Sequence, residues 1–256
     1  MSELSLSFIA NSSVLIDGYS VRILVDGIYG KNPHFTLPRK NIQKAVFGMN
    51  SVYRNINYLL FTHRHTDHFD AAYTDEYVKN NSVKGVYVPE ASNVMDSYLE
   101  DQRQLKTCRA CGILNEFIPE FTKAVRFEPE RDIAISYYRT EHLDGKSYPV
   151  INAGILLEMS GKRIFFAADS DYGKHNKDIL VELGKLDCIL VTPLFLVHPT
   201  GRDIIERISP GRVVIYHLPD EADDRSGLIE LSSKVMNYDY CCPISAFTAE
   251  GQTLEI

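Results

Sequence analysis

The sequence predicts a layered α/β protein in which β-sheets pack between helices. Three observations predict this class. Apolar runs typical of strands dominate the first third of the chain, strand-type and helix-type runs alternate after residue 175, and no repeat or linker divides the 256 residues. A chain of this length can bury a sizeable core, so we expect residues 1–256 to form a single domain.

Short apolar segments between turn residues indicate strands in the first half of the chain. The segment NYLLFT (57–62) is almost continuously apolar, which is typical of a strand buried on both faces. Further strands are expected at 4–9, 13–17, 21–26 and 83–88. Helices are expected at 71–79 and at 91–106, the second because apolar residues recur there at helical spacing.

The second half begins with strand pairs and then alternates between helices and strands. We expect 123–127 to pair with 133–139, and 153–159 to pair with 162–168 across a Ser-Gly turn. Later strands are expected at 187–192, at 212–217 and, as an edge strand, at 252–256. Helices are expected near 178–183, from residue 202 and at 223–235.

Composition and charge restrict the class of protein. The chain is 45% hydrophobic and 24% charged, which is ordinary for a globular enzyme. Its net charge of −7 argues against a broad surface for nucleic acid or anionic membrane. No secretory signal is visible, and the most apolar stretch, 188–197, is too short to span a bilayer. Five cysteines, an odd number, favour reduced thiols. We therefore expect a cytoplasmic protein with reduced cysteines and no broad surface for nucleic acid or membrane.

One segment, FTHRHTDHF (61–69), gathers three histidines and an aspartate within six consecutive positions. Imidazole and carboxylate are the standard ligands of zinc and neighbouring divalent metals. His63 and His65 follow a buried strand, and two rings at this spacing in extended chain point the same way. Asp67 and His68 come where the chain must turn, so they can face a second point close by.

Other ligand-type residues end further expected strands. His142 follows ISYYRTE, Asp169 follows KRIFFAA, His217 ends RVVIYH, and Asp26 ends VRILVD. Enzymes built on sheets tend to place their sites at the ends of strands. This recurrence predicts that the four side chains converge near the His63 cluster.

The segment H-R-H-T-D-H resembles the H-x-H-x-D-H signature of the metallo-β-lactamase superfamily. The downstream order of a lone histidine, a strand-ending aspartate and a strand-ending histidine resembles it too. SVLIDGYSVRILVDG near the start and EGQTLEI at the end resemble the branch of simple metal-dependent hydrolases that includes ascorbate-6-phosphate lactonase. The resemblance implies a four-layer αββα sandwich with a dinuclear metal site in the cleft between the sheet edges.

The resemblance also implies a role for each residue of the set. His63, His65 and His142 would hold the first metal, and Asp67, His68 and His217 the second, with Asp169 bridging the two. Asp26 would support the motif loop by hydrogen bonding rather than as a ligand. The sequence departs from related hydrolases at Asn11, where they often have histidine, and at Gly27, where they often have proline.

Such a site predicts a hydrolase. A metal-bound water has its pKa lowered to about 7, so that hydroxide forms at neutral pH. The hydroxide, oriented by Asp67, would cleave an ester-like bond in a small metabolite: a lactone, thioester, amide or phosphodiester. We expect two divalent ions, zinc first, although histidine and aspartate also accept manganese, iron and nickel. The substrate and the oligomeric state stay open.

Several alternatives accompany this prediction. Asp171 rivals Asp169 as the bridging residue, and His198, before an expected helix N-terminus that could bind an anion, is a candidate substrate-binding group. Cys108 and Cys111 form a lone C-x-x-C without the second pair of a zinc ribbon, and are interpreted as structural. The alternative functions are a phosphodiesterase or nuclease, an iron-dependent oxidoreductase of the same fold, and a non-catalytic metal-binding protein.

Overall fold

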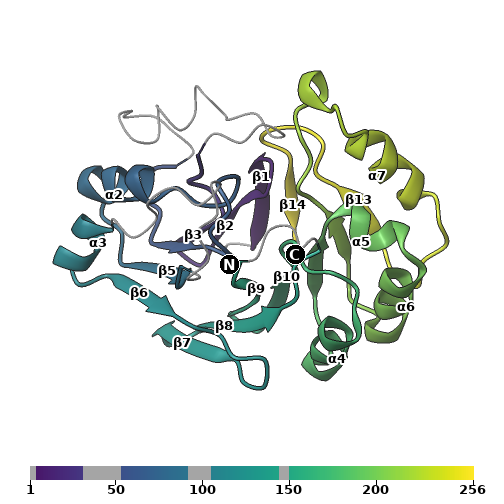
Figure 1. Cartoon of the computed structure of the whole chain (residues 1–256), viewed down its shortest axis with the longest axis horizontal. Helices are drawn as coiled ribbons and strands as arrows, with labels where there is room; N and C mark the ends of the chain where they lie inside the picture. Colours follow the sequence, from purple (N-terminus) through teal and green to yellow (C-terminus); the bar gives the residue numbers. More distant parts are fainter. Residues whose placement is uncertain (1–3, 31–52, 92–104, 144–149) are drawn as a thin grey trace.

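A computed structural model describes residues 4–30, 53–91, 105–143 and 150–256. These residues form two seven-stranded sheets that lie face to face, with helices on both outer faces (Figure 1). The αββα sandwich expected from the sequence is therefore confirmed. No helix in these four ranges is long and apolar enough to cross a membrane.

The first sheet contains the N-terminal strands and the last strand of the chain, in the order β14-β1-β2-β3-β4-β5-β6. Its strands are β1 (Ser5–Ala10), β2 (Ser13–Gly18), β3 (Val21–Val25), β4 (Tyr58–Leu60), β5 (Gly85–Pro89), β6 (Leu114–Phe117) and β14 (Thr253–Glu255). Helices α2 (Ala71–Asn80) and α3 (Lys106–Ala110) cover its outer face. Strand side chains alternate between faces, so Leu59 packs toward the helices while Tyr58 and Leu60 pack toward the second sheet.

The second sheet has the order β13-β12-β11-β10-β9-β8-β7. Its strands are β7 (Val125–Glu130), β8 (Ile133–Thr140), β9 (Asn152–Met159), β10 (Lys162–Phe166), β11 (Cys188–Val191), β12 (Val213–Ile215) and β13 (Ile244–Ala246). The helices on its outer face are α4 (Lys174–Leu183), α5 (Pro193–Val197), α6 (Pro199–Ile208) and α7 (Leu228–Met236).

The inner faces of the two sheets share one apolar core. It brings together side chains such as Ile16 and Leu60 of the first sheet with Ile155 and Phe166 of the second, all fully buried. Apolar burial of this kind contributes roughly 25 cal/mol per Å² removed from water. The core therefore fixes the two sheets against each other, and with them the strand ends at their rims.

Strand direction decides which side chains meet at the rim. β3 and β4 are parallel, and so are β10, β11 and β12. β8 runs antiparallel to β9, which runs antiparallel to β10, so β8 points the same way as β10. The carboxyl ends of β8, β10 and β12 therefore lie at one edge of the second sheet, as the strand-end pattern predicted.

Most of the expected elements are present, with several differences. β6 and β13 were not predicted, because LNEF and ISA are short and only partly buried. Helix α5 was not predicted either, since PLFLV has no helical period in five residues; its start is set by Thr192, whose side chain accepts from the Phe195 N–H, and by Pro193. The helix expected at 91–106 falls mainly on residues outside the described ranges.

The other differences concern helix starts. α4 and α6 begin before the expected positions, at Lys174 and Pro199, and α7 begins later, at Leu228. The later start has a clear cause: Gly227 adopts φ +67° and the Asp224 carboxylate accepts from the N–H groups of Leu228 and Ile229. The carboxylate thus caps the helix at this residue.

Candidate metal centre

The loop after β4 carries the first part of the site. β4 ends at Leu60 and the chain turns at residues 65–69, where the N–H groups of His68 and Phe69 both donate to the His65 carbonyl at 2.9 Å. This turn brings the imidazoles of His63, His65 and His68 together, with ring centroids of His63 lying 4.7 Å from His65 and 3.9 Å from His68. All three are nearly or fully buried.

A buried network behind this loop fixes the rings. Asp26, fully buried at the end of β3, accepts from the Thr62 N–H at 2.8 Å, from the Thr62 hydroxyl at 2.7 Å and from His68 Nδ1 at 2.9 Å. Because the Thr62 hydroxyl gives its proton to Asp26, it accepts from His63 Nδ1, 2.9 Å away. The Nε2 atoms of His63 and His68 are then left as acceptors that face the site. The supporting role expected for Asp26 matches this geometry.

Two further residues hold the loop, and the sequence did not assign either of them. Arg64, between the two histidines, is only 1% exposed; its Nε donates to the Pro89 carbonyl at 2.6 Å and it pairs with Glu116 at 2.8 Å. Asn11 donates from Nδ2 to the Asp67 carbonyl at 2.8 Å. Alternation along HRH puts Arg64 on the opposite side from the histidines, a signal that could have identified it. The difference from related hydrolases at Asn11 therefore affects a residue that supports the loop carrying Asp67.

The second sheet supplies three more side chains from separate strand ends. The chain beyond β8 pairs with the chain beyond β10: His142 bridges Ser170, and the Leu143 N–H donates to the Asp169 carbonyl at 2.7 Å. This pairing sets the His142 and Asp169 side chains next to each other, with His142 Nε2 3.4 Å from Asp169 Oδ2. His217 lies two residues beyond the end of β12.

Backbone strain gathers around the site. Asn11, Asp26, Ala168 and His217 have φ values of +52°, +48°, +54° and +61°. Each non-glycine residue in this region costs on the order of 1–3 kcal/mol, which persists only where the surrounding structure imposes it. The positive φ at Ala168 also shows why Asp169 does not extend its strand: β10 ends at Phe166, three residues before the aspartate. The prediction that Asp169 directly follows the end of its strand is therefore wrong, because two further residues lie between them.

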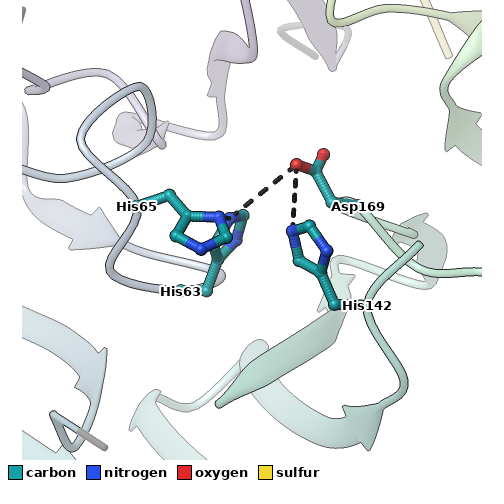
Figure 2. Close-up of side chains that lie close together, drawn as sticks. All are labelled: His63, His65, His142 and Asp169. Atoms are coloured by element: carbon teal, nitrogen blue, oxygen red, sulfur yellow. Dashed lines mark hydrogen bonds and ion pairs between the residues drawn. The ribbon is translucent and has the colours of Figure 1, made fainter. Parts of the chain in front are cut away.

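The seven predicted side chains form two adjoining groups, in each of which the ligand-type atoms lie within 4.8 Å of one another. The first contains His63, His65, His142 and Asp169, whose side chains point toward a common centre (Figure 2). His63 Nε2 lies 3.1 Å from His65 Nδ1 and 3.8 Å from Asp169 Oδ2. The second contains Asp67, His68 and His217.

Asp169 lies between the groups. Its Oδ2 is 3.4 Å from His68 Nε2 and its Oδ1 is 3.3 Å from His217 Nε2, while its Oδ2 also faces the first group. Within the second group, the Nε2 atoms of His68 and His217 are 3.0 Å apart, and Asp67 Oδ2 is 3.8 Å and 3.7 Å from them. One carboxylate therefore contacts imidazoles of both groups.

These spacings fit a divalent ion. Two ligand atoms at about 2.0–2.1 Å from a tetrahedral zinc lie about 3.3 Å from each other. In both groups, pairs of ligand atoms 3.0 to 3.8 Å apart lie on either side of that value, and all ligand atoms of a group lie within 4.8 Å of one another. Nitrogen and carboxylate oxygen are also the donor types that such ions prefer. The donor set and its spacing thus fit a metal site.

The electrostatics of the first group agree with this. Burial lowers the pKa of His63 well below its usual value, and the neighbouring His68 and His65 lower it further. Burial, followed by His142, lowers the pKa of His65 to about 4. Both rings are therefore neutral at pH 7, the form that binds a metal. Burial alone would raise the pKa of Asp169, but His217 and His68 hold it well below its ordinary value, so it stays a carboxylate. In the second group, burial alone would lower the pKa of His68, but Asp169, Asp67 and Asp26 raise it well above its usual value, so metal binding there would release a proton.

A pocket of about 190 Å³ opens onto the site. Four of the seven side chains form part of its lining, namely Asp67, His142, Asp169 and His217. Both groups are thus reachable from one cavity, which is where a substrate would meet them.

A family model described as a beta-lactamase superfamily domain matches residues 22–219, which include all seven side chains. The chain belongs to this family. Its resemblance to the metallo-β-lactamase superfamily is confirmed, and its closeness to the ascorbate-6-phosphate lactonase branch stays a prediction. A search of curated proteins with this sequence gives no match.

Solved structures of the superfamily share the fold at low sequence identity. Igni18, a metallo hydrolase from Ignicoccus hospitalis, is 16% identical with a TM-score of 0.64, covering 100% of this chain and 99% of its own. Zn²⁺-bound PqqB from Methylobacterium extorquens is 16% identical with a TM-score of 0.58, covering 95% and 87%. CmlA, a diiron β-hydroxylase from Streptomyces venezuelae, is 15% identical with a TM-score of 0.63; it covers all of this chain, which spans only 55% of CmlA.

The structure places the remaining candidates outside the two groups. The Asp171 carboxylate accepts from the Gly173 N–H and from Asn176 at the start of α4, 2.8 and 2.7 Å away. His198 lies between α5 and α6, not after a strand; its Nδ1 accepts from the Thr200 N–H, and its ring stacks on Tyr172 at 3.8 Å. It does not line the 190 Å³ pocket, and its substrate-binding role stays a prediction.

The five cysteines are free thiols. Cys108 lies within α3 rather than after a helix, and burial followed by the nearby Asp75 raises the pKa of its thiol to about 12. A thiol held protonated in this way is a poor nucleophile. The structural role expected for this residue agrees with its burial.

Proposed function

We propose that the protein is a metal-dependent hydrolase that holds two divalent ions, with zinc as the expected element. His63, His65 and His142 would bind one ion, and Asp67, His68 and His217 the other, with Asp169 shared between them. The observation that carries this proposal is the position of Asp169, whose two oxygens lie 3.3 to 3.8 Å from imidazole nitrogens of both groups.

When bound, such ions lower the pKa of a coordinated water to about 7 and polarise the oxygen of a scissile bond. The residues of the chain then have separate tasks. Asp67, 6% exposed and fixed through its carbonyl by Asn11, presents a carboxylate to the pocket, where it can accept a proton from the attacking water and orient it. The Asp26–Thr62 network keeps the Nε2 atoms of His63 and His68 directed at the ions.

The proposed reaction is hydrolysis of a lactone, thioester, ester, amide or phosphodiester bond in a small molecule. A carboxylate such as that of Asp67, which can accept a proton from water, suits the addition of water to a carbonyl or phosphoryl centre. Neighbours of the same fold include a zinc-bound protein and a diiron hydroxylase, so the element has to be measured. Iron-dependent oxidation and cleavage of nucleic acid are the outcomes that would displace the proposal.

Elemental analysis of the purified protein together with a substrate panel tests this. We expect about two equivalents of zinc per chain, turnover of at least one ester-like substrate, and no oxygen consumption. The Asp169→Ala variant should lose both metal and turnover, whereas Asp171→Ala, which changes a carboxylate outside the groups, should keep the metal. Iron at two equivalents with oxygen consumption would contradict the hydrolase.

A further inference from the structure

Apart from the four residues of the metal groups, the pocket lining is mostly apolar. The 190 Å³ pocket is completed by Leu143 after β8, Thr192, Pro193 and Leu194 at the start of α5, and Leu228 at the start of α7. Helices α5 and α7 contact each other, and residues at the start of each line the same pocket. A substrate whose reacting bond lies at Asp67 and Asp169 must therefore place an adjacent group against this lining.

Apart from the side chains of the metal groups, the described residues that line this pocket are uncharged. Among the described residues that line the pocket there is neither lysine nor arginine. A second hollow of about 300 Å³, beyond the Asn11–Leu218 bridge, is likewise lined by no described lysine or arginine and carries three carboxylates, of Asp220, Glu221 and Glu250. Away from the ions, an anionic group of a substrate would thus find no described lysine or arginine to pair with.

The helix N-termini around the pocket are also taken. The Asp224 carboxylate accepts from the Leu228 and Ile229 N–H groups at 2.8 Å, so α7 already holds an anion at its start. The Thr192 side chain accepts from the Phe195 N–H at 3.3 Å, and His198 Nδ1 accepts from the Thr200 N–H at 3.2 Å. The N–H groups of Phe195, Leu228 and Ile229, at the starts of the two helices that line the pocket, are therefore engaged within the chain.

From this lining we infer that the substrate carries a compact, uncharged apolar group next to the bond that is cleaved. The inference rests on the proposed function and names its substrate class: neutral acyl compounds with a branched or cyclic hydrocarbon side. The size follows from the volume, since a cavity of roughly 150 Å³ lined by apolar side chains binds benzene, and this pocket measures about 190 Å³. The same lining disfavours a phosphate or a second carboxylate at the position of this group.

A matched pair of esters tests the inference on the zinc-loaded protein. Methyl 4-methylpentanoate and monomethyl succinate have the same leaving group and nearly the same shape, but the first ends in two methyls and the second in a carboxylate. We expect kcat/KM, followed by proton release, to be at least tenfold higher for the first, since each buried methyl contributes about tenfold in an apolar pocket. Equal values, or a preference for the succinate ester, would overturn the inference.

A charge placed in the wall should change the preference. Leu194 is 38% exposed, so a lysine there can reach solvent without disturbing the core. Leu194→Lys should lower kcat/KM for the 4-methylpentanoate ester at least tenfold and raise it for the succinate ester. Val181→Lys, at a 46% exposed position on α4 away from the pocket, is the matched control and should leave both values unchanged. A similar response of the two variants would count against the pocket assignment.

Binding of matched hydroxamates separates this inference from the proposed function. If neither ester is cleaved, binding to the pocket can still be measured without turnover. Calorimetry with 4-methylpentanohydroxamate and succinate monohydroxamate on the zinc-loaded protein should show at least tenfold tighter binding of the first, reduced by Leu194→Lys and unaffected by Val181→Lys. Equal affinities, or no binding of either compound, would overturn the inference.

Discussion

The two sheets contribute to the metal centre in different ways. The first sheet delivers four side chains from one loop, His63 to His68, and supports them with a buried network of Asp26 and Thr62 behind the rings. The second delivers His142, Asp169 and His217 from three strand ends, two of them beside or at residues with positive φ. In the first half side-chain hydrogen bonds reach the imidazole rings directly, whereas in the second they support the paired backbone that carries His142 and Asp169.

This difference suggests that the halves respond differently to mutation. In the first half a residue outside the ligand set can change the site, because tautomer and ring position depend on its hydrogen bonds. In the second half, buried hydrogen bonds among Thr140, Asn152 and Ser170 support the strand pairing of His142 with Ser170, so a residue outside the ligand set would act there through the backbone. The core between the sheets keeps the halves together.

The largest effect should come from Asp169, the residue that contacts both groups. We expect Asp169→Ala to lower kcat/KM by about a thousandfold, corresponding to the loss of about 4 kcal/mol of transition-state stabilisation by the ions. Metal content should fall in parallel, measured by elemental analysis. Full turnover in a variant that has lost its metal would break the comparison, because the halves would then not share a centre.

A smaller effect is expected in the network behind the first half. In Asp26→Asn, the amide would donate to His68 Nδ1 and force the proton onto Nε2, which then could not bind a metal. Metal affinity should fall about 10- to 100-fold, as measured by competition with a chelator. Asp17→Asn, at an aspartate that is half exposed and pairs with Arg22 on the sheet surface, is the control and should leave the affinity unchanged. Unchanged affinity in Asp26→Asn would show that the network has no such role.

A substitution of Arg64 tests whether the loop that carries the histidines depends on the contacts of Arg64 with Pro89 and Glu116 at the edge of the first sheet. Arg64→Met removes a buried cation from Glu116, which keeps a contact with Arg109. We expect a loss of about 3 kcal/mol in the free energy of unfolding, equivalent to a lower Tm by roughly 5–10 °C. Arg126→Met, which changes a half-exposed arginine on β7, is the control. In the same denaturation experiment its free energy of unfolding should fall by less than about 1 kcal/mol. Equal losses in the two variants would contradict the anchoring role.

The smallest effect is expected away from the centre, where α2 meets α3. Burial alone would raise the pKa of Asp75, but hydrogen bonds from Thr107 and Cys108 lower it. A lowered folded-state pKa adds stability above the unfolded value of about 3.9, and the gain is lost as pH falls through the folded pKa. Asp75→Asn should cost about 1–2 kcal/mol at pH 7, and less below pH 4, in urea denaturation at several pH values.

The metal affinity of Asp75→Asn shows whether the first sheet as a whole, or only its buried network, holds the ligands. The residue lies on the outer side of the first sheet, so Asp75→Asn should leave chelator competition unchanged. A drop in metal affinity comparable to that of Asp26→Asn would show that the whole first half, and not only its buried network, holds the ligands.

The sequence alone predicted the sandwich and the seven side chains that meet at its rim. The motif could be identified because residues 63–68 are neighbours along the chain and must lie within a few ångströms of one another. The strand-ending histidines and aspartate could be identified because parallel strands bring their carboxyl ends to one edge. Short elements such as α5 and β13 could not be predicted, since they hold too few residues to show a period.

Only the tertiary structure decided between Asp169 and Asp171, and only it revealed the roles of Arg64 and Asn11. It also assembled the apolar wall from Leu143, Leu194 and Leu228, which belong to different elements. The physical reason is the same in each case. These contacts join segments far apart in the chain, and packing of the two sheets and their helices, not local spacing, determines which side chains face one another.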